Sequence, residues 1–135
     1  MTLDRIDPPE LPRPSGFAHA VAGTGRTVFL AGQTAQDAAG RIVPGNIVAQ
    51  FERALANLLT ALRAAGGEPE QLAALTIYIV DVDDYRAHAA EIGAVWRRLA
   101  GSQYPATAGV GVARLWDPAA LVELQGIALL PTSPG

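Results

Sequence analysis

The sequence contains no cysteine, which excludes disulfide bonds, thiolate nucleophiles, iron–sulfur clusters and thiolate zinc sites. Histidine is scarce as well, because His19 and His88 are the only two and lie in separate segments. A metal site would therefore have to take most of its ligands from carboxylates. From this composition we expect neither a metal nor a cofactor.

A membrane span and a secretory signal are also missing. The longest unbroken apolar runs, such as Ile77–Val80 and Ile127–Leu130, are far shorter than the roughly 18 to 20 residues that cross a bilayer. Residues 1–11 mix Asp, Arg, Pro and Glu, and no basic segment there is followed by an apolar stretch. The sequence therefore predicts a cytoplasmic protein with no membrane partner.

Positive charge is sparse too. The formal net charge is −3, and Arg97 and Arg98 are the only adjacent cationic residues. Nucleic-acid binders normally carry a basic stripe, because neutralising phosphates supplies much of their affinity. We therefore expect no nucleic-acid partner.

What is present fits one globular domain. The chain has 135 residues, of which 50% are hydrophobic and 17% charged, so it can bury a core. Several prolines in residues 1–15 predict an extended N-terminal arm, because each proline ring fixes φ and removes a hydrogen-bond donor. A single domain at residues 16–131 and a short tail at 132–135 are expected to follow.

The spacing of apolar residues changes several times along the chain. It predicts strands at residues 17–22, 26–32, 72–80, 108–115 and 121–130, with a short further strand near 41–43. Apolar steps of three and four predict a helix over 47–62, capped by Asn46 and stopped at Gly66–Gly67, and a second helix from about Asp81 to Leu99. The order β-β-(β)-α-β-α-β-β predicts an α+β fold, a mostly antiparallel sheet with two helices on one face.

We expect the last two strands to form a hairpin, whose register is fixed by matching the apolar faces. In that register Val110 and Val112 face the helices. The other face would carry Thr107, Gly109, Gly111, Ala113, Glu123, Gln125 and Ile127. It is either a half-solvated face with Glu123 in water, or a face that packs against copies of the chain and leaves Glu123 at a subunit seam.

Short motifs follow one another along nearly the whole globular part, from about Gly16 to Leu130. They comprise Gly16–Val21 (GFAHAV), Val28–Gln33 (VFLAGQ), Gln50 with Ala54–Leu58 (ALANL), Leu62 with Ala65–Gly67, Thr76–Ile79 with Asp81, Tyr104–Ala106 (YPA), Val110–Val112 with Leu115, and Leu121–Leu124 (LVEL). In this order and spacing the motifs together resemble the Rid family, also called the RidA/YjgF family.

The resemblance implies a fold, an assembly and a chemistry. Rid proteins have a chorismate-mutase-like fold of the bacillus type, form homotrimers and hold small molecules between neighbouring subunits. Their best-understood members hydrolyse reactive enamines and imines to ketones and ammonia. Glu123 stands at the position of the family's water-positioning Glu, where a carboxylate can orient water against an electrophilic carbon.

The pocket implied by the resemblance is less polar than that of the known deaminases. Thr107 stands where the family has an Arg that grips the substrate carboxylate, and a hydroxyl cannot replace that planar charged fork. The other implied pocket residues are Phe17 in place of a Tyr, Ala31 in place of a Ser, Gly32, Gly109 in place of a Cys, and Gln125 in place of an acidic residue. We therefore expect a substrate less anionic than the 2-imino acids.

Two functions remain open at this point. The first is a deaminase-like hydrolase of imines or enamines in which Glu123 is the catalytic residue. The second is a non-catalytic protein that holds a small metabolite between subunits. A ribonuclease activity, an older suggestion for the family, is disfavoured by the acidic net charge.

The remaining conspicuous residues have structural interpretations. We expect Trp96 in the core, Arg114 at the surface, and the acidic group that begins at Asp81 as a helix cap rather than a calcium loop. His19 is interpreted as structural, although it could line the pocket mouth. Trp116 either packs onto its own sheet or marks an exposed contact.

Overall fold

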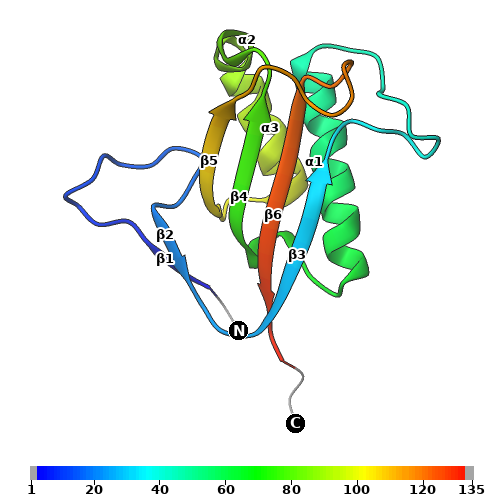
Figure 1. The fold of residues 1–135 in the computed structure, drawn as a ribbon. Helices are drawn as coiled ribbons and strands as arrows, with labels where there is room; N and C mark the ends of the chain where they lie inside the picture. Colours follow the sequence, from blue (N-terminus) through cyan, green and yellow to red (C-terminus); the bar gives the residue numbers. More distant parts are fainter. Residues whose placement is uncertain (1–2, 133–135) are drawn as a thin grey trace.

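The computed structural model describes residues 3–132 and has two layers, a β-sheet and the helices that cover one of its faces (Figure 1). The main sheet has four strands in the order β3-β6-β4-β5, and β1 and β2 form a separate small sheet. In chain order the elements are β1 Asp4–Ile6, β2 Ala20–Ala22, β3 Arg26–Gln33, α1 Ile47–Ala64, the 3-10 turn η1 Pro69–Gln71, β4 Leu72–Ile79, α2 Val82–Ala87, α3 Ala89–Ala100, β5 Ala106–Gly111 and β6 Val122–Leu130. The predicted α+β class is confirmed.

Helix α1 lies along the sheet, and its two ends form as the sequence predicts. The side chain of Asn46 caps the helix by accepting a hydrogen bond from Ala49 N at 3.1 Å. Just beyond its C-terminus, Gly66 has a φ of 96°, a left-handed conformation that glycine adopts without a steric penalty. These two signals fix the helix so that its apolar stripe faces the sheet.

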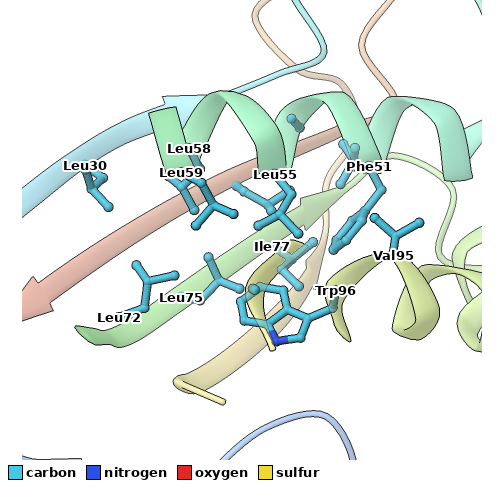
Figure 2. Packing of buried hydrophobic residues seen from close by; sticks show 14 of the residues in the cluster. Leu30, Phe51, Leu55, Leu58, Leu59, Leu72, Leu75, Ile77, Val95 and Trp96 are labelled. Atoms are coloured by element: carbon cyan, nitrogen blue, oxygen red, sulfur yellow. The ribbon is translucent and has the colours of Figure 1, made fainter. Parts of the chain in front are cut away.

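The core lies between α1, α3 and the sheet (Figure 2). Phe51, Leu55 and Leu58 of α1 are almost completely buried and pack in one cluster with Ile77 of β4. Trp96 of α3 belongs to the same cluster and is 6% exposed, which confirms its predicted place in the core. This packing holds α3 against β4 and β5.

Strand β5 does not form the predicted hairpin with β6. It is an edge strand that pairs in parallel with β4, whereas β6 lies between β3 and β4. The reason is the segment that joins β4 to β5, because it contains two helices. Parallel neighbours need such a crossover, whereas the strands of a hairpin are joined by a short turn. The prediction wrongly assumed that two strands adjacent in the sequence are also adjacent in the sheet.

The predicted second helix is in fact two helices. It breaks at His88, whose φ of −110° and ψ of 17° lie outside the helical region. Asp81 caps α2 by accepting a hydrogen bond from Asp84 N at 3.0 Å, so the capping interpretation is confirmed. The break lets α2 lie beyond the ends of β4 and β5 while α3 runs along the covered face of the sheet (Figure 1).

The N-terminal arm is extended, and it also forms a strand that was not predicted, β1. β1 pairs antiparallel with β2, and Arg5 donates hydrogen bonds to the backbone carbonyls of Tyr104 at 2.9 Å and Glu70 at 3.0 Å. The strand predicted at 17–22 is correspondingly shorter, and the one near 41–43 is reduced to an isolated bridge. Residues 1–2 of the predicted arm and 133–135 of the predicted tail lie outside the described residues.

Residues 3–132 contain neither a candidate membrane span nor a cluster of metal-binding side chains. No helix there combines the length and the apolar character needed to cross a membrane. No three His, Asp or Glu side chains in that range gather closely enough to hold a metal ion.

Candidate functional site

Glu123 lies on the face of the sheet that the helices leave uncovered. It sits in β6 between Val122 and Leu124, which are fully buried beneath the helices, and side chains alternate between the two faces along a strand. Across the ladder it pairs with Tyr78 of β4. Its half-buried carboxylate has no hydrogen-bond or ion-pair partner among residues 3–132. An unpaired carboxylate is therefore presented on the open face.

The carboxylate of Glu123 packs against the backbone of Gly32. Strand β3 has a bulge between Leu30 and Gln33, so that Ala31 and Gly32 leave the regular pairing with β6. A Cβ built at position 32 would lie 2.8 Å from Cδ of Glu123, closer than real Cβ atoms approach other heavy atoms. Ala31 and Gly32 thus lie at the same end of the open face as Glu123.

Gln125 shares this face and is exposed. Its Oε1 accepts a hydrogen bond of 2.9 Å from the hydroxyl of Tyr78, the residue that pairs with Glu123. No sequence pattern marks Tyr78 as a site residue. The hydrogen bond restrains the side chain next to Glu123 and leaves the carboxylate itself unoccupied.

Around these polar groups the open face is apolar. Phe29 is 78% exposed, Ile127 38% and Val110 39%. Phe29 and Ile127 pair directly across β3 and β6, so their side chains are adjacent. Clustered exposed apolar residues of this kind are typical of interaction surfaces. Val110 lies on this face, and its predicted orientation toward the helices is wrong.

Thr107 and Gly109 lie on the opposite face from Glu123. In the parallel ladder they pair with Leu75 and Ile77 of β4, which are buried beneath the helices, and directly paired residues share a face. Their predicted place beside Glu123 within one chain is wrong, because β5 pairs with β4 and not with β6. Their role in ligand binding stays a prediction.

Thr107 lines a cavity of about 540 Å³ between β4, β5 and α3. Small-molecule sites typically occupy about 300 to 1,000 Å³ and are mostly apolar with a few polar groups. The walls of this cavity fit that description, with Leu75, Ile77 and the stacked rings of Trp96 and Tyr104, whose centroids are 6.0 Å apart. The hydroxyl of Thr107 already donates to the carbonyl of Pro105 at 2.9 Å.

Two polar residues of this cavity, Tyr85 and Arg97, were not predicted as site residues. Burial raises the pKa of the Tyr85 hydroxyl to about 12, so this group stays protonated at neutral pH. The strand–helix–strand order could have predicted that both residues lie near β4 and β5, because the helices of a parallel crossover pack over the strands that they join.

Phe17 is half-buried on the segment that leads into β2 and runs beside β5, where Ala18 N donates to the Pro105 carbonyl at 3.1 Å. Its ring meets that of His19 edge-on, with centroids 5.1 Å apart. The backbone N–H of His19 donates to Asp7 Oδ1 at 2.8 Å. Phe17 is therefore close to the start of β5, and His19 connects it to the N-terminal arm.

The loop between β5 and β6 carries Trp116, which is 96% exposed. The interpretation in which Trp116 packs onto its own sheet is therefore wrong. Arg114 in the same loop is exposed, as predicted.

Comparisons of the sequence with known proteins agree with this fold. Residues 10–130 match the family model described as Endoribonuclease L-PSP. A RutC family protein from Synechocystis sp. is 33% identical over 135 residues, which cover 98% of this chain and 100% of that protein. The 2-iminobutanoate/2-iminopropanoate deaminase of Capra hircus is 32% identical over 105 residues, which cover 77% of this chain and 73% of that enzyme.

Two solved structures superpose on most of this chain. A protein of unknown function of the conserved Rid protein family from Yersinia pestis superposes with a TM-score of 0.85 and 36% identity, covering 96% of this chain and 100% of that one. A putative endoribonuclease from Thermotoga maritima superposes with a TM-score of 0.70 and 28% identity, covering 87% of this chain and 89% of that one.

Proposed function

This chain belongs to the Rid family, which the matching family model describes as Endoribonuclease L-PSP, and from this premise we propose that it is a deaminase-like hydrolase of reactive imines or enamines. The observation that carries the proposal is Glu123. Its unpaired carboxylate lies on the open face beside the glycine bulge of β3, at the position of the family's water-positioning Glu. The similarity to named imine deaminases supports the same chemistry.

Hydrolysis of an imine needs a group that orients water and moves protons. The water oxygen bonds to the imine carbon while the π electrons of the C=N bond move to nitrogen. The resulting amino alcohol then breaks its C–N bond, releases ammonia and leaves the ketone. Glu123 takes a proton from water and gives it to the nitrogen, and it then passes the hydroxyl proton of the amino alcohol to the departing nitrogen, so the carboxylate is regenerated and no oxidant or reductant is consumed.

The expected pocket residues can meet only between chains. Glu123, Ala31, Gly32 and Gln125 are near the open face, whereas Thr107 and Gly109 are on the helix-covered face of the same sheet. We propose a homotrimer in which the open face of one copy packs against the β5 edge of the next. The exposed side chains of Phe29 and Ile127 support this contact, because burying apolar surface contributes roughly 25 cal/mol per Å².

A non-catalytic metabolite-binding protein is the second candidate. It is favoured by Thr107, because the family's known deaminases have an Arg at this position and the Thr107 hydroxyl is already bonded to Pro105. In this alternative the pocket between subunits holds a ligand that the protein does not transform.

Ammonia release decides between the two candidates. We expect the wild-type chain to accelerate ammonia release from some members of a panel of imines that includes uncharged imines as well as the 2-imino acids formed in situ by an amino-acid oxidase acting on L-leucine or L-phenylalanine. Glu123→Gln should lower kcat by about a hundredfold or more with an unchanged Tm, and Glu10→Gln, a carboxylate on the exposed arm, should match the wild type. Turnover that survives Glu123→Gln contradicts the proposed mechanism. Thermal stabilisation by a ligand without any turnover favours the binding protein.

The family description also names an endoribonuclease. The net charge of −3 argues against RNA as the substrate, because RNA binding draws much of its affinity from cationic contacts with phosphates. We expect no cleavage of single-stranded RNA at low salt, where such contacts are strongest.

A further inference from the structure

Trp116 is the most exposed large apolar side chain among residues 3–132, with 96% of its surface open to solvent. The other tryptophan of the chain, Trp96, is 6% exposed and belongs to the core. Exposed apolar residues are common on protein surfaces, but tryptophan is one of the residue types enriched at protein–protein interfaces and depleted elsewhere on the surface. The indole of Trp116 is therefore a candidate contact with a partner.

The loop that carries Trp116 is fixed to the rest of the fold. Asp117 closes a turn, because its Oδ1 accepts a hydrogen bond of 2.8 Å from Ala119 N. Gln50 of α1 is 4% exposed; its Nε2 donates to the carbonyl of Ala119 at 3.1 Å, and its Oε1 accepts from Leu121 N at 2.8 Å. A buried amide thus clamps the loop. The indole is held out by a segment that is ordered before any partner binds, which lowers the entropic cost of a contact.

This loop emerges at the end of the sheet where Glu123 lies. It joins β5 to β6 and passes over the end of the sheet at which β6 begins (Figure 1). Glu123 is the second residue of β6. Leu121, which Gln50 holds, also accepts a hydrogen bond of 3.1 Å from Val80 N at the end of β4. A molecule that covers the Glu123 end of the open face therefore also meets the loop of Trp116.

A second copy of this chain is the partner that the arrangement favours. Glu123 lies on the open face and Thr107 on the covered face, so the two meet only where the β5 edge of another copy approaches the Glu123 end of the sheet. That edge borders the cavity of about 540 Å³ between β4, β5 and α3. The stacked rings of Trp96 and Tyr104 belong to its walls, and a further aromatic ring complements such a surface.

From this arrangement we propose that Trp116 docks on a second copy of the chain, where its indole covers the mouth of the cavity between α3 and β5. The pocket between subunits then has an aromatic wall that a single chain lacks. Burying an aromatic side chain of this kind removes roughly 150 to 250 Å² of surface from water. This inference rests on the assembly in the proposed function, but the contact can be measured without turnover.

The exposure of Trp116 in solution tests the contact. The chain has two tryptophans, so the full-length protein labelled with fluorotryptophan gives two fluorine NMR resonances, which Trp116→Phe assigns. A neutral gadolinium chelate broadens exposed fluorines; the N-acetyl amide of fluorotryptophan is the exposed reference, and Trp96 is the buried one. We expect Trp116 to be broadened at least about fivefold less than the amide, because the core of an interface packs like a protein interior. Broadening equal to that of the amide, in a trimer or in a monomer, would overturn the proposal.

Photo-crosslinking identifies the surface that the indole touches. p-Benzoylphenylalanine, a photoreactive aromatic residue, replaces Trp116, and isotope-labelled and unlabelled chains are refolded together before irradiation, so mass spectrometry separates contacts between copies from contacts within one. We expect crosslinks between copies at α3 or β5. The same residue in place of Thr60, an exposed position of α1 in the helix layer, is the matched control and should form none between copies. Crosslinks within one chain only, or to other elements of the second copy, would overturn the docking position.

Variants and kinetics separate this contact from the proposed reaction. Trp116→Ser should raise the concentration at which half of the trimer dissociates by about tenfold or more, and Trp116→Phe, which keeps an aromatic ring, should raise it less. If Glu123→Gln left turnover intact while position 116 crosslinked to α3 or β5 of a second copy, the proposed mechanism would fail and the docking contact would stand. If Glu123→Gln abolished turnover in a trimer whose Trp116 is as exposed as the reference amide, the docking contact would fail instead.

Discussion

The carboxylate of Glu123 lies directly against Gly32, the glycine in the bulge of β3. The bulge leaves Ala31 and Gly32 outside the regular ladder, and the absence of a side chain at position 32 leaves the space that the carboxylate fills. The position of the acid is therefore set by two strands together, since β6 directs Glu123 to the open face and β3 limits where its carboxylate can lie.

The first prediction concerns that contact. Gly32→Ala would place a Cβ 2.8 Å from Cδ of Glu123, so the carboxylate must move. Because a small displacement of a catalytic group is costly, we expect kcat to fall by about tenfold to a hundredfold. Both residues lie outside the main hydrophobic cluster, so thermal unfolding should show a Tm within a few degrees of the wild type. Full activity in Gly32→Ala would contradict a positioned carboxylate.

The second prediction concerns assembly. We expect the wild type to sediment at three times the chain mass of 14.0 kDa. Phe29→Asp should dissociate it, because the 78% exposed Phe29 side chain would be buried in the trimer, where an unpaired carboxylate is costly. Thr60→Asp places the same charge on an exposed position of α1, in the helix layer, and is the matched control. A wild-type monomer at micromolar concentration would contradict the homotrimer.

Sequence patterns predicted the elements better than they predicted which elements are neighbours. Asn46 and Gly66 fixed both ends of α1 through local capping chemistry, which any single sequence displays. The place of β5 depends on the path of α2 and α3, which is a tertiary property. The prediction for Thr107 therefore failed at the level of pairing, although the existence of its strand was correctly predicted.

The same distinction explains why the candidate site was only half predicted. Glu123 was identified because its position follows from one motif on one strand. The cavity that Tyr85 and Thr107 line depends instead on how the helices pack over β4 and β5, which is a tertiary property.

The third prediction concerns pH. The ring of His88 bonds to the backbone carbonyl of Asp84, with Nδ1 2.9 Å from the oxygen, and this contact raises the His88 pKa, helped by the negative charges of Asp84 and Glu91. A pKa raised by folding stabilises the folded state below the unfolded pKa of about 6.5, and this contribution is lost as the pH rises through the folded value.

Urea unfolding at several pH values between 5 and 8 tests the contribution of His88. Relative to the wild type, His88→Gln should lose stability at the acidic end and little at the alkaline end. Equal losses at every pH would assign His88 a packing role at the break between α2 and α3 and would contradict a role for its charge.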